Sequence, residues 1–101
     1  MKVLNQEEVG NKTNGSSLAG YIQITYPQLI SILGEPTYPE ESGDNKVQKE
    51  WVVEYKGNVF TIYDWKTFDE EYTMNKLGRF NVGSKGSALE FIDALENKLK
   101  E

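Results

Sequence analysis

The sequence predicts an α+β fold in which a small antiparallel sheet, centred on a β-hairpin at residues 48–66, packs against a C-terminal helix at residues 87–100. Two runs rich in Val, Ile, Tyr, Trp and Phe flank Gly57-Asn58, which is typical of a two-residue hairpin turn. Near the C-terminus, apolar residues recur at helical spacing. A short helix at residues 26–33 completes the predicted fold.

The predicted hairpin has one apolar face. Counting outward from the turn pairs Tyr55 with Phe60 and Val53 with Ile62, and side chains alternate between the two faces along each strand. The face expected to form the core consists of Trp51, Val53, Tyr55, Phe60 and Ile62. The opposite face consists of Val52, Glu54, Val59, Thr61, Tyr63 and Trp65. We expect this opposite face to be covered by a second copy in a homodimer or higher oligomer, or by the helix at residues 26–33.

Both predicted helices carry start signals. Thr25 and Gln28 have the spacing of a capping box, and Gly34 is placed to end the first helix. Ser87 and Glu90 have the same spacing at the start of the C-terminal helix. The apolar face of that helix consists of Ala88, Phe91, Ile92, Leu95 and Leu99.

The remaining segments are assigned from composition and turn residues. Residues 1–17 are expected to be a polar leader that precedes a single domain at residues 18–101. Residues 21–25 and 79–82 are expected to be further strands. Two segments are expected to be loops, residues 37–46 and residues 67–75.

The composition excludes several classes of active site. The chain has no cysteine and no histidine, which excludes disulfides, a Ser-His-Asp triad and zinc sites with nitrogen or sulfur ligands. Asp64 lies on the predicted apolar face, where we expect it to bond a neighbouring loop rather than to act in catalysis. Residues 69–71 are acidic but lack the spacing of a calcium loop. We therefore expect no enzyme, no cofactor and no metal site.

The charges are unevenly distributed. Eleven basic and sixteen acidic residues give a net charge of −5, which should repel duplex nucleic acid. Acids concentrate in residues 35–54 and 64–71, whereas residues 72–89 contain none and carry Lys76, Arg79 and Lys85. This local basic stretch suits a small anionic ligand; the alternative is that all these charges are simply solvated.

A glycine-rich segment precedes the C-terminal helix. Glycines allow close backbone approach, serines add hydroxyl groups, and helix N-termini attract anions. The candidate phosphate-binding residues are Asn81, Gly83, Ser84, Lys85, Gly86 and Ser87. The alternative is an ordinary turn followed by a serine cap.

Exposed aromatic residues are the second part of the candidate site. Tyr63 and Trp65 are predicted on the hairpin face opposite the core, and Tyr21 lies on the leading strand. Such side chains can stack on a planar base, or they can pack against another layer or a second protomer. The cations expected to assist with phosphates are Arg79, Lys66 and Lys76.

No targeting or membrane signal is evident. No apolar run approaches the ~20 residues that span a bilayer, and the N-terminal ten residues lack the apolar stretch of a signal peptide. We expect an intracellular protein without membrane partners.

Several stretches between about residues 17 and 95 resemble a known family. They are Ser17-Leu18, Gly20-Tyr21-Ile22, Thr25-Tyr26, Leu33-Gly34-Glu35-Pro36-Thr37, Glu50-Trp51, Thr61-Ile62-Tyr63-Asp64-Trp65-Lys66, Val82-Gly83-Ser84 and Ser87-Ala88-Leu89. In these the chain resembles a broad family of small phage-encoded proteins. Phe80 stands where that family leads one to expect tryptophan or another aromatic residue, so the departure from the family pattern is mild.

The resemblance implies a phage setting, and hence the cytoplasm of an infected host cell. Small acidic phage proteins often act against host defences. The expected function is non-enzymatic sequestration of a small nucleotide-derived immune signal. The alternative is an acidic inhibitor that masks a host defence protein by occupying a basic surface.

Overall fold

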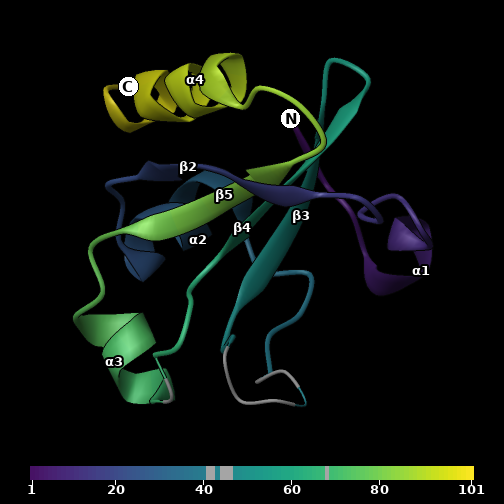
Figure 1. The fold of residues 1–101 in the computed structure, drawn as a ribbon. Helices are drawn as coiled ribbons and strands as arrows, with labels where there is room; N and C mark the ends of the chain where they lie inside the picture. Colours follow the sequence, from purple (N-terminus) through teal and green to yellow (C-terminus); the bar gives the residue numbers. More distant parts are fainter. Residues whose placement is uncertain (41–42, 44–46, 68) are drawn as a thin grey trace.

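The computed structural model describes residues 1–40, 43, 47–67 and 69–101. The strands form one antiparallel five-stranded sheet in the order β1-β3-β4-β5-β2. The elements in chain order are β1 (Lys2–Val3), α1 (Gln6–Val9), β2 (Ser17–Ile22), α2 (Tyr26–Leu33), β3 (Glu50–Tyr55), β4 (Asn58–Tyr63), α3 (Glu70–Asn75), β5 (Phe80–Ser84) and α4 (Leu89–Leu99). The α+β fold with a central hairpin and a C-terminal helix on the sheet is confirmed (Figure 1). Part of the predicted loop at residues 37–46 lies outside the described residues.

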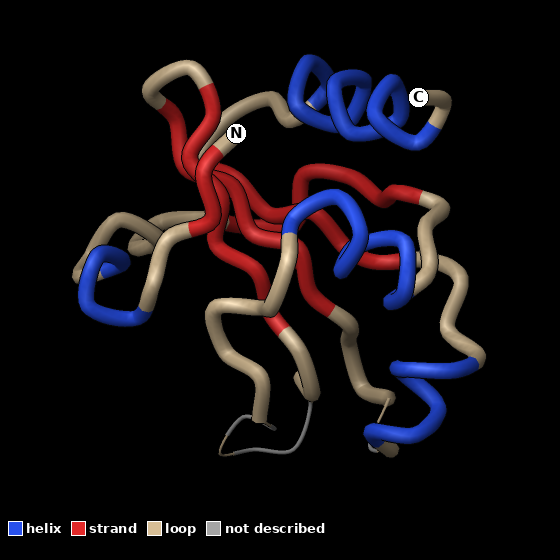
Figure 2. The backbone as a smooth tube through the Cα atoms, turned by 180° about the vertical axis from the view of Figure 1, so that it is seen from behind, coloured by secondary structure: helices blue, strands red, loops and turns tan. Residues whose placement is uncertain are grey.

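Helices α2 and α4 cover one face of the sheet, which we call the core face. Figure 1 shows α4 running along β2 and β5. Figure 2, which shows the molecule from behind, shows α2 lying across the strands. The side chains of this core come from the sheet and both helices, and they are Ile22, Ile24, Leu29, Trp51, Val53, Phe60, Ile62, Phe80, Val82, Ala88, Phe91, Ile92 and Leu95. The predicted core face of the hairpin is therefore correct.

The hairpin turn is displaced from its predicted position. Tyr55 pairs with Asn58 and Val53 with Phe60, so the two turn residues are Lys56 and Gly57, not Gly57 and Asn58. Both have positive φ, 51° and 81°, as a type I′ turn requires. The predicted register is thus wrong by two residues. A register shift of two residues leaves every side chain on the same face of the sheet, so the predicted core face is still correct.

The segment expected to be a polar leader contains a strand and a helix. β1 pairs with β3, and Asn5 caps α1 by accepting from the Glu8 amide at 2.8 Å. Leu4 and Val9 are buried against Val52 in a second apolar cluster, with Tyr38 and Val59 at its edge. This cluster lies on the face opposite the core, which we call the outer face. The part of the outer face at β3 is therefore covered by the chain's own N-terminus and not by α2.

Three other boundaries differ from prediction. β2 begins at Ser17, not at residue 21, because pairing with β5 extends to Ser84 despite the weak strand propensity of its Ser, Ala and Gly residues. β5 correspondingly runs to Ser84. The predicted loop at residues 67–75 contains α3, where Asp69 accepts from the Glu71 amide at 2.9 Å. Asp69 and the acids after it are a helix start signal.

The second predicted capping box is not formed. α4 begins at Leu89 with Ala88 as its N-cap, and the Ser87 hydroxyl accepts from the Leu89 amide at 3.3 Å. Glu90 instead pairs with Lys56 of the hairpin turn. In contrast, the predicted box at Thr25 is present and α2 has the predicted bounds. In the part of the chain that the structure describes, no helix is long and apolar enough to cross a membrane.

Candidate ligand-binding site

A row of polar and aromatic residues crosses four strands on the outer face. Glu50 of β3 pairs with Tyr63 of β4, Tyr63 with Asn81 of β5, and Asn81 with Tyr21 of β2. Residues opposite each other on neighbouring strands project from the same face. The sheet therefore aligns these four side chains, which we call the outer-face row. Three of them, Tyr21, Tyr63 and Asn81, are predicted site residues.

Glu50 and Tyr63 are held close together within this row. The amide and carbonyl of Glu50 both bond Tyr38, at 3.0 and 2.9 Å, on the side away from β4. The Glu50–Tyr63 pair is thus a narrow one, in which side chains approach most closely. Burial raises the pKa of the Tyr63 hydroxyl, with smaller contributions from the charge of Glu50 and from Tyr21.

A pocket of about 290 Å³ opens beside the row, near the lower end of the ~300–1,000 Å³ range of small-molecule sites. Its described lining residues are Thr13, Ser16, Ser17, Val47, Glu50, Thr61, Tyr63, Trp65 and Gly83. The ring of Trp65 stands edge-on to Tyr63 at 6.4 Å between centroids, and Trp65 is 48% exposed. We call this hollow the aromatic pocket. Its walls combine aromatic rings with hydroxyl groups.

Two polar groups in the aromatic pocket are poorly satisfied. The Ser16 hydroxyl oxygen is buried and has no hydrogen-bond partner among the described residues. Burial, followed by the charge of Asp64, raises the pKa of the Glu50 carboxyl. Buried polar groups without partners are costly, so each group is poised to accept a bond from something that enters.

Two cations border the aromatic residues. The Arg79 guanidinium lies 4.6 Å from the centre of the Tyr21 ring, and the Lys66 ammonium lies 5.9 Å from that of Trp65. Both cations are exposed on the surface. Lys66 also adopts φ of 57°, an uncommon conformation for a residue with a side chain. Positive charge therefore lies beside the rings without being buried between them.

The glycine-rich segment lines a different hollow. This second hollow, of about 480 Å³, is lined by Lys12, Glu54, Gly57, Asn58, Val59, Phe60, Ser84, Lys85, Gly86 and Ser87. The Ser84 hydroxyl accepts from the Gly86 amide at 3.3 Å, and Ser87 accepts from Leu89. These two amides are thus already bonded within the chain. Lys12 and Lys85 remain as the cations of this hollow.

Gly83 is required by packing. A Cβ at this position would lie 2.6 Å from the Thr61 hydroxyl oxygen and 3.5 Å from the Tyr63 ring. Any side chain at residue 83 would displace one of them. Its glycine therefore allows β4 and β5 to pack closely, whereas the sequence suggested an approach to phosphate.

The structure divides the predicted site into two. The row residue Asn81 and Ser84 are three residues apart along β5, about 10 Å. Of the candidates, Tyr63, Trp65 and Gly83 line the aromatic pocket, whereas Ser84–Ser87 line the hollow beside the hairpin turn. The remaining candidates line neither hollow, and they are Tyr21, Lys66, Lys76, Arg79 and Asn81. Sequence reasoning did not identify Glu50 as a site residue, although strand alternation alone places it on the face of Thr61 and Tyr63. No pattern in the sequence indicated that Ser16 and Thr13 would line the pocket.

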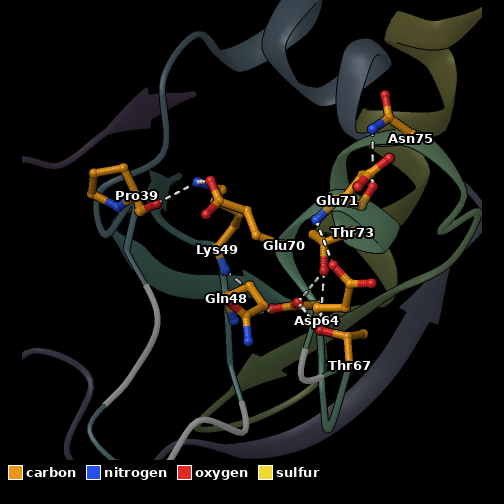
Figure 3. Close-up of polar contacts among 10 residues, drawn as sticks. Pro39, Gln48, Lys49, Asp64, Thr67, Glu70, Glu71, Thr73 and Asn75 are labelled. Carbon is orange, nitrogen blue, oxygen red and sulfur yellow. Dashed lines mark hydrogen bonds and ion pairs between the residues drawn. The ribbon is translucent and has the colours of Figure 1, made fainter.

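Asp64 has a structural role, as expected. It is 1% exposed and accepts from the Gln48 amide at 2.8 Å, the Lys49 amide at 3.1 Å and the Thr73 hydroxyl at 2.6 Å (Figure 3). The Thr67 hydroxyl donates to the same carboxylate. This network ties the start of β3 to α3 and fixes the chain that leads from Asp64 into Trp65.

Comparisons with known proteins identify no relative. No protein-family model matches the sequence, and no match is found among curated proteins or solved structures. Among the described residues, no three Asp or Glu side chains are grouped as metal ligands would be. The case for a function therefore depends on the geometry of the aromatic pocket.

Proposed function

We propose that the chain is a phage-type, non-enzymatic binding protein that sequesters a small nucleotide-derived immune signal in the cytoplasm of an infected cell. The observation that carries the proposal is the outer-face row, in which Tyr21 and Tyr63 lie on one face of the sheet on either side of Asn81. Trp65 lies beside Tyr63, and Arg79 lies over the Tyr21 ring. Rings and cations placed side by side suit a ligand with a planar base and a phosphate.

Typical strengths of stacking and of charge-assisted hydrogen bonds are sufficient for micromolar binding of a nucleotide. Stacking of a base on an aromatic ring contributes about 1–3 kcal/mol, and a charge-assisted hydrogen bond about 1.5–3 kcal/mol. A few of each supply the roughly 8 kcal/mol that a micromolar Kd requires. We place the base against Tyr63 and Trp65, and the phosphate near Arg79 and Lys66.

The same arrangement disfavours long nucleic acids. The net charge of −5 repels a polyphosphate backbone, whereas a compact anion needs only the local cations beside the rings. Sequestration also requires no reacting group, in keeping with a chain that has neither histidine nor cysteine.

Ligand capture tests this proposal. Purified protein is incubated with a lysate of cells whose antiphage defence is active, washed and heated, and the released small molecules are identified by mass spectrometry. We expect a phosphate-containing nucleotide derivative. If instead a host protein is retained, and salt weakens its retention, the masking-inhibitor alternative replaces sequestration.

Self-association is a further part of the proposal, through the free edge of β2. The sheet ends at this six-residue strand, and from Thr13 to Gly34 the chain has no charged residue. Edge strands normally carry charge or proline that prevents pairing. Because the chain is acidic elsewhere, a second copy approaches with least repulsion along this uncharged strand, and two β2 strands can pair antiparallel about a two-fold axis.

Leu18→Lys tests the edge pairing. Leu18 is 49% exposed on β2, and a lysine there introduces like charges across the two-fold axis. Light scattering should show a dimer for the wild type and a monomer for this variant. Tyr72→Lys, at a similarly exposed residue of α3, should leave the dimer intact. A wild type that is monomeric at millimolar concentration would refute the pairing.

A further inference from the structure

Glu50 is the one acidic side chain among the described lining residues of the aromatic pocket. It is half-buried and faces Tyr63 across the narrow strand pair. Its carboxylate has no ion pair or hydrogen bond to a described residue. Glu54, four residues further along β3 and on the same face, lines the other hollow. Glu50 is thus a hydrogen-bond acceptor with no donor among the described residues.

A carboxylate with no partner among the described residues restricts which ligands can enter the pocket. A carboxylate accepts hydrogen bonds and donates none when ionised, and removing it from water without a donor is unfavourable. A phosphate entering beside Glu50 would be repelled. An N–H group entering there would supply the missing donor, and the unpartnered Ser16 hydroxyl adds a second polar contact in the same pocket.

We propose that Glu50 selects a guanine-type base by accepting hydrogen bonds from its ring N–H and the adjacent amino group. This inference rests on the proposed function and names the base of its ligand. Two parallel N–H groups match the two oxygens of a carboxylate, as in bidentate arginine–carboxylate pairs. The base then lies against Tyr63 and Trp65, and its phosphate points outward to the cations.

Other bases fit this acceptor less well. The corresponding edge of adenine presents a ring nitrogen lone pair beside its amino group, and that lone pair opposes a carboxylate oxygen. Hypoxanthine keeps the ring N–H but lacks the amino group, so it makes one bond where guanine makes two. A good bidentate contact to a base discriminates by about 1–3 kcal/mol, which corresponds to roughly 5- to 150-fold in affinity.

The test is calorimetric titration with guanosine, inosine and adenosine 5′-monophosphates. We expect the wild type to bind the guanosine nucleotide at least about 5-fold more tightly than the other two. Glu50→Gln should reduce that preference toward equality. Glu54→Gln is the matched control, since it is the same residue type on the same strand and face, and it should keep the preference.

The outcomes separate this inference from the function on which it rests. If all three nucleotides bind equally to the wild type, Glu50 does not select the base, and sequestration stands. If none binds, both the base selection and the nucleotide site are wrong. The wild-type preference decides the question even if Glu50→Gln is unstable.

Discussion

Replacing Trp51 with alanine is expected to lower the free energy of unfolding by about 3–5 kcal/mol. Trp51 is fully buried at the centre of the core, where its ring lies 5.8 Å from that of Tyr26 and 5.9 Å from that of Phe80. Its indole N–H also donates to the Gly34 carbonyl at 3.0 Å, which ties the end of α2 to the sheet. Alanine would leave a cavity and an unpaired carbonyl.

Urea denaturation followed by circular dichroism measures this loss. Trp65→Ala is the matched control, because Trp65 is 48% exposed and its truncation leaves no buried cavity. We expect that control to change the free energy of unfolding by less than about 1 kcal/mol. A Trp51→Ala midpoint equal to that of the wild type would contradict the core described above.

Replacing Asp64 with alanine is expected to cost about 3 kcal/mol or more. The change leaves the amides of Gln48 and Lys49 and the hydroxyls of Thr67 and Thr73 without their acceptor, and each buried unsatisfied group costs about 1–3 kcal/mol. Asp64→Asn keeps one carbonyl oxygen, so a smaller loss is expected.

The control for Asp64 is Asp93→Ala. Asp93 is exposed on α4, so its removal should have little effect on stability. Thermal unfolding of the three variants gives the comparison. If Asp64→Ala is as stable as Asp93→Ala, the network of Figure 3 does not hold β3 and α3 together.

Some elements specified by signals within one short segment of the sequence were predicted correctly. α2 has the predicted bounds because Thr25, Gln28 and Gly34 specify its ends within one short segment. The hairpin faces were correct because alternation survives a two-residue error in register. The turn itself was misplaced because Lys56 adopts positive φ, which sequence preference assigns to glycine or asparagine.

Elements that depend on distant partners were not predicted. Leu4 and Val9 show no periodicity, and their burial depends on Val52 beneath them. The capping box formed by Asn5 and Glu8 is a local helix signal that the sequence analysis missed. The aromatic half of the candidate site was predicted from strand alternation. The sequence analysis joined Ser84–Ser87 and the aromatic residues in one site. The structure places them at separate hollows, because residues close together along β5 need not line the same pocket. Glu50 was not recognised as a site residue, because only the three-dimensional structure shows that its carboxylate has no hydrogen-bond donor among the described residues.

The central claim is that the aromatic pocket, together with the cations beside the Tyr21 and Trp65 rings, captures a small phosphorylated ligand. Heat release followed by mass spectrometry tests it most directly when wild type is compared with Arg79→Glu, Lys85→Glu and, as a control, Lys98→Glu on α4. We predict that wild type, Lys98→Glu and Lys85→Glu release the same nucleotide-derived molecule, and that Arg79→Glu releases at least about tenfold less. A wild-type protein that releases nothing, or an Arg79→Glu variant that captures as well as wild type, would contradict the account.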